Sequence, residues 1–209
     1  MFKILLIYLR SFIGIPLLLV GSPLIHERGY WCGLDAQTEH QFDFWLAQAI
    51  AKFLQQEQAN HVADFGCGMG DYVRLLQAYH IDCIGLDGNP DTERLTHGLG
   101  MTLDFTQKME IHKVFDWVIS LEVGEHIPPE YETIFLENLD KHNIKGIILS
   151  WAVQGQGGYG HVNEQNNSVI KAKLAHMGYT NDLEAENQMR KEASLWWFKK
   201  SLMVFRKES

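Results

Sequence analysis

Cysteine is scarce in this chain, and its scarcity excludes the small folds that disulfides or zinc hold together. The 209 residues include three cysteines, Cys32, Cys67 and Cys83. Their number is odd and their spacing does not match a metal-binding ribbon. Free thiols are typical of a reducing compartment, so we expect a cytoplasmic protein.

Positive charge is also scarce. Lysine and arginine number 18 against 26 aspartates and glutamates, which gives a formal net charge of -8. A protein that binds by neutralising phosphates needs the opposite balance, so nucleic acid is not expected as a partner. The chain also lacks internal repeats and low-complexity tracts. Its length and its 46% hydrophobic residues predict one domain with a full core.

One apolar stretch stands apart at the N-terminus. Residues 12–25 are nearly all apolar, and Lys3 and Arg10 precede them. Three interpretations stay open: membrane association through residues 1–25, a secretion signal with a small-residue site near Ser22, or a helix packed on the domain over its site. The sequence does not fix the oligomeric state.

After this stretch the chain is no longer continuously apolar, and polar and charged residues become frequent. We therefore divide it into an apolar N-terminal segment, residues 1–26, and a domain over residues 27–209. An amphipathic helix is expected near the start of the domain, because apolar residues recur there at helical spacing. These residues are Phe42, Trp45, Leu46, Ala49, Ile50 and Phe53.

The most informative stretch runs from Val62 to Gly70. An apolar run ends in Asp64, and glycines follow at every second position, Gly66, Gly68 and Gly70. A strand that turns through glycines into a helix lets backbone N–H groups approach a nucleotide-like ligand. The dinucleotide-binding pattern is excluded, because the third glycine comes one position too early. A second apolar run ends in Asp87, where a carboxylate can accept hydrogen bonds from ribose hydroxyls.

These two elements resemble the class I S-adenosylmethionine (SAM) methyltransferases, whose motif I has an acidic residue two positions before G-x-G. The resemblance covers about residues 60–206. It implies an α/β fold, a three-layer sandwich around a mostly parallel, seven-stranded Rossmann-like sheet that ends in a reversed hairpin. Residues 195–205 are expected to form that hairpin, which argues against an NAD-binding domain.

The resemblance also implies the cofactor, SAM, and the residues that hold it. Asp104 would contact the adenine amine and Phe105 would pack on the adenine ring, although a solvated turn is the alternative role for Asp104. The implied cofactor-binding residues are Asp64, Gly66, Cys67, Gly68, Gly70, Asp87, Gly88, Asp104, Phe105 and Leu121.

A second set of polar residues follows the apolar run 114–121. Glu122, Glu125 and His126 are spaced i, i+3 and i+4, so a helical turn would place them on one face. His161 comes directly after a glycine-rich loop and is expected to open a helix. Two carboxylates and two imidazoles suit a divalent metal such as Mg²⁺ or Mn²⁺.

This spacing is similar to that of the ubiquinone-pathway O-methyltransferases and of the small-RNA 3′-terminal 2′-O-methyltransferases. We therefore assign Glu122, Glu125, His126 and His161 as candidate metal ligands, and Glu125, His126 and His161 as candidate catalytic residues. Two alternatives stay open, direct base catalysis by a histidine and a purely structural role.

The expected function is the transfer of a methyl group from SAM to an oxygen atom of a small-molecule acceptor. A divalent metal is expected to assist this reaction. Two alternatives of other kinds stay open. One is a 2′-O-methyltransferase of RNA 3′ ends, and the other is a non-catalytic SAM-binding module at a membrane.

Overall fold

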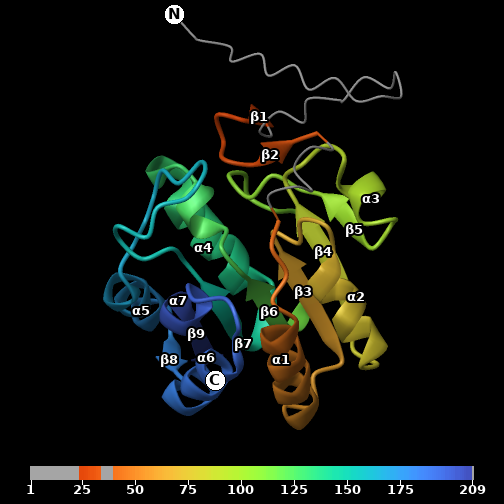
Figure 1. Cartoon of the computed structure of the whole chain (residues 1–209), viewed down its shortest axis with the longest axis vertical. Helices are drawn as coiled ribbons and strands as arrows, with labels where there is room; N and C mark the ends of the chain where they lie inside the picture. The colour runs from red at the N-terminus through yellow and green to blue at the C-terminus, as the bar shows by residue number, and fades with distance from the viewer. Residues whose placement is uncertain (1–23, 34–39, 209) are drawn as a thin grey trace, which may run out of the picture.

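The computed structural model describes residues 24–33 and 40–208, and its centre is a seven-stranded sheet (Figure 1). The strand order is β5-β4-β3-β6-β7-β9-β8. Strands β3 to β7 are parallel, and β9 is antiparallel to both of its neighbours. The bounds are β3 His61–Phe65, β4 Asp82–Asp87, β5 Gly100–Thr102, β6 Phe115–Ser120, β7 Asn143–Ser150, β8 Tyr179–Asn181 and β9 Leu202–Lys207. The expected fold class is confirmed.

Helices cover both faces of the sheet and make the outer two layers (Figure 1). One face packs against α1 (Phe44–Gln56), α2 (Asp71–Ala78) and α6 (Leu183–Glu192). The other face packs against α4 (Glu132–Lys141) and α5 (Asn167–His176). Residues 24–33 and 40–208 also contain the short helices α3 (Thr92–Leu95) and α7 (Phe198–Ser201) and the 3₁₀ turns Gly124–His126 and Pro129–Tyr131. Because both faces are covered, the central strands are almost continuously apolar.

The first long helix buries part of the expected face, since Leu46 and Ile50 are buried and Ala49 and Phe53 pack against the core. Its buried residues are Leu46, Ala47, Ile50, Ala51 and Leu54. Trp45 is 57% exposed and Phe42 precedes the helix. The small residues Ala47 and Ala51 thus belong to the buried stripe, which faces the neighbouring helices α6 and α2.

The C-terminal elements also differ from expectation. The reversed strand pair consists of β8 and β9, with α6 and α7 between them, while Leu195–Trp197 form a turn before α7. Helix α5 begins at Asn167, so His161 lies in a loop and not at the start of a helix.

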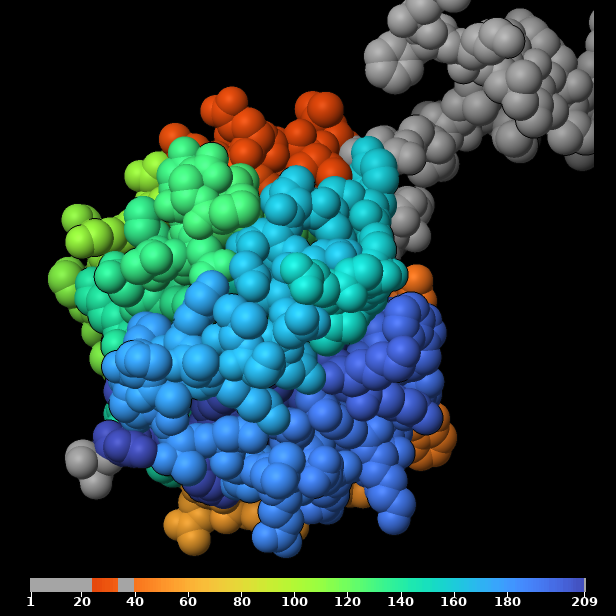
Figure 2. Space-filling model, turned by 90° about the vertical axis from the view of Figure 1, so that its left-hand side faces the viewer, coloured from red at the N-terminus to blue at the C-terminus, as the bar shows by residue number. Residues whose placement is uncertain are grey.

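A two-stranded hairpin, β1 (Leu24–Ile25) and β2 (Trp31–Cys32), covers the carboxyl ends of the parallel strands. Figure 2 shows it at one end of the molecule, beside the loop that follows β7. Residues 1–23, on which the membrane, secretion-signal and helix interpretations depend, lie outside the described residues. The hairpin already begins at Leu24, before the expected domain boundary at residue 27. None of the helices within residues 24–33 and 40–208 has both the length and the apolar character to cross a bilayer.

Candidate active site

The glycine turn after β3 approaches its surroundings too closely for any side chain. Gly66, Gly68 and Gly70 have φ values of 90°, 51° and 75°, in the left-handed region that favours glycine. A Cβ atom on Gly66 would lie 2.2 Å from a methyl carbon of Val123. The turn leads into α2 at Asp71, so it delivers the N-terminus of a helix to the sheet edge.

Two carboxylates meet at this edge. Asp87, at the end of β4, accepts hydrogen bonds from the backbone N–H groups of Gly68 and Asn89, both at 2.9 Å. Asp64 lies behind it and is buried, and its Oδ2 has no hydrogen-bond partner among the described residues. Burial, and then the charge of Asp87, raise the pKa of Asp64 to about 7.

A cavity of about 380 Å³ opens above these carboxylates. Nine of the ten residues assigned to the cofactor line it: Asp64, Gly66, Cys67, Gly68, Asp87, Gly88, Asp104, Phe105 and Leu121. Gly70 is the exception, because it caps α2 and packs toward Thr96. The structure therefore gathers the assigned residues around one space, which is what a shared ligand requires.

Asp104 and Phe105 differ in their surroundings. Asp104 Oδ2 accepts a hydrogen bond from Arg28 at 2.6 Å, and its Oδ1 accepts two from Thr106. These donors hold the pKa of Asp104 below its usual value in spite of partial burial. Phe105 is 5% exposed and stacks on Phe65. Asp104 is thus an anchored ion-pair partner and not a freely solvated turn residue.

The N-terminal hairpin roofs the cavity. Arg28 pairs with Asp104, and the Tyr30 side chain lies over Gly88. At the other end of the roof, Gly29 approaches the carbonyl of His126, and the Trp31 ring is 5.5 Å from the His126 ring, edge to face. The hairpin therefore spans both the cofactor side and the His126 side of the cavity.

Only part of the polar group expected after β6 comes together in the structure. Glu125 and His126 lie in the 3₁₀ turn that follows β6. Glu122 precedes this turn with a φ of 54°, and its carboxylate accepts hydrogen bonds from Ser201 at 2.9 Å and Gln156 at 2.8 Å. Its carboxylate therefore lies beside Glu125 but outside the group of ligand atoms that come together, which corrects the expectation that all three residues share one face.

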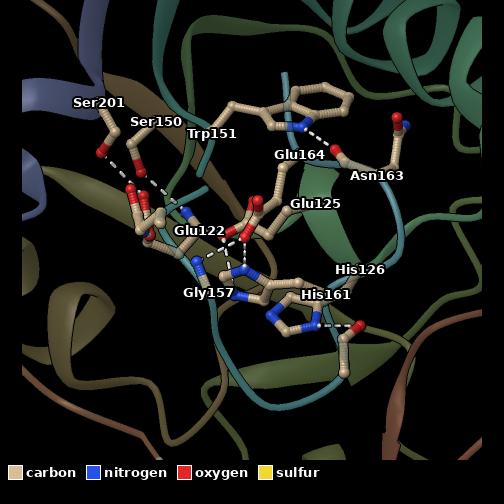
Figure 3. A network of polar contacts seen from close by, with 12 residues as sticks. Glu122, Glu125, His126, Ser150, Trp151, Gly157, His161, Asn163, Glu164 and Ser201 are labelled. Atoms are coloured by element: carbon tan, nitrogen blue, oxygen red, sulfur yellow. Dashed lines mark hydrogen bonds and ion pairs between the residues drawn. The ribbon is translucent and has the colours of Figure 1, made fainter. Parts of the chain in front are cut away.

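His161 joins Glu125 and His126 from another segment (Figure 3). The backbone N–H groups of Val162 and Asn163 both donate to the carbonyl of Glu125 at 2.9 Å. His161 Nε2 is 3.9 Å from Glu125 Oε1, and the rings of His126 and His161 are 5.0 Å apart. Ligand atoms of Glu125, His126 and His161 lie within 4.8 Å of one another.

Glu125 is the least satisfied polar group of the site. Its side chain is fully buried, and neither carboxylate oxygen has a hydrogen-bond partner within the described part of the chain. Burial, and then the charge of Glu122, raise its pKa well above the ordinary value. Burial also lowers the pKa of His126 to about 4, so its ring is neutral at pH 7. A divalent cation fits here, because it would satisfy the orphaned carboxylate and takes neutral imidazole as ligand.

Sequence reasoning missed several residues around this cluster. Glu164 accepts a hydrogen bond from His161 Nδ1. Its position three residues after His161 is the sequence signal that points to this contact. Arg28, Gln156 and Ser201 carry no local signal, because their partners lie 76, 34 and 79 residues away in the sequence.

No protein-family model and no curated protein matches the sequence. Solved structures do match. Magnesium protoporphyrin IX methyltransferase ChlM from Synechocystis PCC 6803, with bound SAH, aligns with a TM-score of 0.62 and 17% identity over 83% of this chain and 91% of that chain. The sugar N-methyltransferase KedS8 from Streptoalloteichus aligns with a TM-score of 0.67 and 12% identity over 99% of this chain and 100% of that chain.

The N-methyltransferase NodS from Bradyrhizobium japonicum WM9, in complex with SAH, aligns with a TM-score of 0.59 and 16% identity over 78% of this chain and 86% of that chain. At such identities the likeness establishes the fold alone. The chain has the fold of the class I SAM-dependent methyltransferases.

Proposed function

We propose that the protein is a SAM-dependent methyltransferase that methylates an oxygen atom of a small molecule with the help of a divalent metal. The observation that carries the proposal is the cluster of Glu125, His126 and His161 at the same sheet edge as the glycine turn. A methyl donor and an acidified acceptor hydroxyl would meet in one cavity, which supplies proximity and orientation.

The cofactor side rests on the glycine turn and its two carboxylates. Asp87 is fixed by two backbone N–H groups, which leaves lone pairs for the ribose hydroxyls of SAM. The Asp87 carboxylate gives this end of the cavity negative charge, and Asp64 behind it is a further hydrogen-bonding group, which suits the sulfonium and ammonium groups of the cofactor. The known structures of the same fold that contain SAM or SAH support this assignment.

The acceptor side rests on the metal cluster. Glu125, His126 and His161 would hold the cation, which supplies acidification of a bound hydroxyl. His126 Nδ1 donates to the carbonyl of Gly160 at 3.2 Å and His161 Nδ1 donates to Glu164 at 3.0 Å. Both rings are thereby oriented with Nε2 available as the ligand atom.

The charge of the cavity selects the kind of acceptor. The charged lining residues that the structure describes are Asp64, Asp71, Asp87, Asp104, Glu122 and Arg28, and the arginine is already paired with Asp104. A phosphate-bearing acceptor would meet repulsion without a free cationic side chain among these residues. We therefore propose a neutral or cationic small molecule and not an RNA end as the acceptor.

Calorimetric titration of Mn²⁺ into the full chain, saturated with SAH, tests the metal assignment. The wild type is expected to bind one Mn²⁺, and His126→Ala is expected to lose at least tenfold in affinity, which is about 1.4 kcal/mol. His112→Ala is the control, because His112 is exposed and precedes the start of β6, whereas Glu125 and His126 follow the end of that strand.

If SAH binds but Mn²⁺ does not bind to the wild type, the metal assignment is wrong and the histidines become base or substrate contacts. If neither SAH nor SAM binds, the methyltransferase proposal itself fails.

A further inference from the structure

One carboxylate, that of Glu164, holds three separate groups of the loop after β7. Its Oε2 accepts a hydrogen bond from Gly155 N at 2.8 Å. Its Oε1 accepts from Gly157 N at 2.7 Å and from His161 Nδ1 at 3.0 Å. Figure 3 shows Gly157, His161 and Glu164 in this arrangement.

The backbone of the loop is shaped to meet this anion. Gly155 and Gly157 have φ values of 81° and 70°, a conformation that side chains disfavour. Successive backbone N–H groups turned toward one centre form an anion-binding concavity. Here the anion comes from the protein itself, nine and seven residues further along the chain.

The loop carries groups that face the cavity. Gln156, between the two anchored glycines, lines the cavity and donates to Glu122 Oε2 at 2.8 Å. Tyr159 also lines it and lies 6.3 Å from the Trp31 ring of the roofing hairpin. The conformation that Glu164 imposes on the loop therefore shapes the acceptor side of the cavity.

The same carboxylate sets the state of His161. A carboxylate can only accept, so Nδ1 of His161 carries the proton and Nε2 points to Glu125 at 3.9 Å. When a carboxylate accepts a hydrogen bond from one ring nitrogen of a histidine, it fixes the tautomer and the ring orientation, so the other nitrogen is available to a metal.

We propose that Glu164 is a positioning residue that couples the conformation of the glycine loop (residues 154–160) to the orientation of His161. When Glu164 holds Gly155 and Gly157, it also presents the Nε2 lone pair of His161 to the cluster. The effect on metal binding rests on the proposed function, whereas the effects on the loop and on the tautomer do not.

The test compares Glu164→Ala and Glu164→Gln with the wild-type full chain, and with Glu184→Gln as a control on an exposed residue of α6. Three properties are measured: ¹⁵N chemical shifts of the His161 ring, hydrogen exchange of the Gly155 and Gly157 amides, and Mn²⁺ affinity with SAH bound. Glu164→Ala is expected to give a mixture of His161 tautomers, at least tenfold faster exchange at both glycines, and about 10- to 100-fold weaker Mn²⁺ binding. Glu164→Gln keeps one acceptor oxygen, so its values should lie between those of the alanine variant and the wild type.

Unchanged exchange and an unchanged ring spectrum in both variants would overturn the inference. If the wild type binds no Mn²⁺, the metal assignment fails, yet the exchange and the ring spectrum still decide the role of Glu164. A matching loss in both variants and in Glu184→Gln would show a general effect of substitution and would also overturn it.

Discussion

At the scale of single residues, the site contains buried carboxylates whose protonation the fold controls. Asp64 and Glu125 are both buried with raised pKa values, and each has an oxygen without a hydrogen-bond partner within the described residues. Such groups cost stability when charged, and they persist where a ligand repays that cost. Each marks one side of the cavity, Asp64 the cofactor side and Glu125 the metal side.

The pKa of Asp64 leads to a prediction about pH. The native state holds the proton up to about pH 7, whereas the unfolded chain releases it near 3.8. The stability from this proton is therefore fully present below pH 3.8 and is lost as the pH rises to about 7. An asparagine does not titrate, so Asp64→Asn removes this loss. The free energy of unfolding of the variant relative to the wild type should therefore rise between pH 4 and pH 8, by on the order of 4 kcal/mol in total.

Denaturant unfolding of both proteins without SAM, at several pH values, measures this gain. Glu93→Gln, an exposed neutralisation on α3, is the control and should track the wild type. A difference between Asp64→Asn and the wild type that does not change with pH would contradict the prediction.

At the scale of elements, the N-terminus of α1 is tied to the C-terminal part of the chain. Asp43 caps the helix through Leu46 N at 3.1 Å and is fully buried. The same carboxylate accepts from Ser194 N and Leu195 N, both at 2.7 Å, and from Ser194 Oγ at 2.9 Å. One side chain thus fixes both the helix and the turn before α7.

Asp43→Ala should lower the free energy of unfolding by about 3 kcal/mol, because a helix cap is worth about 1 kcal/mol and buried N–H groups lose their acceptor. Asp91→Ala is the matched control, since Asp91 is the N-cap of α3 but makes no side-chain capping bond. Equal losses in the two variants, measured by urea unfolding, would show that the contacts to Ser194 and Leu195 do not matter.

The sequence predicts an element well where its signal is local. The strand and glycine turn around Asp64 are correct because adjacent residues specify them. The expected face of α1 is only partly correct: Leu46 and Ile50 are buried, but Trp45 is exposed and Ala47 is buried in its place, a difference that spacing alone does not reveal. Spacing predicts Glu122 in the cluster, yet its left-handed backbone and its hydrogen bonds with Ser201 and Gln156 hold its carboxylate outside the set of Glu125, His126 and His161.

At the scale of the whole molecule, the roofing hairpin connects parts that the sequence separates widely. Arg28 and Asp104 are 76 residues apart, and no local pattern could reveal their pairing. Asp104 is the residue to which we assign the adenine amine of SAM. Arg28 therefore occupies an oxygen atom that the cofactor is expected to use.

Arg28→Ala should speed the association of SAM about two- to fivefold, because Asp104 then no longer has to exchange a solvent-screened ion pair for the cofactor. Stopped-flow tryptophan fluorescence measures this rate, because Trp31 lies on the same hairpin. Arg94→Ala, an exposed substitution on α3, should leave the rate unchanged. A slower association in Arg28→Ala would mean that Arg28 recruits the cofactor and does not obstruct it.

The position of β9 between β7 and β8 has a consequence for the order of folding. Strand β8 precedes β9 in the chain but joins the sheet only through it. During synthesis, β8 and α6 therefore emerge before the strand that can receive them, and the edge of β7 stays open meanwhile. The parallel half of the sheet can pair first, whereas the half that carries Ser201 and completes the support of Glu122 must wait for the last strand. Ordered synthesis would thus yield a cofactor side that forms early and an acceptor side that matures late.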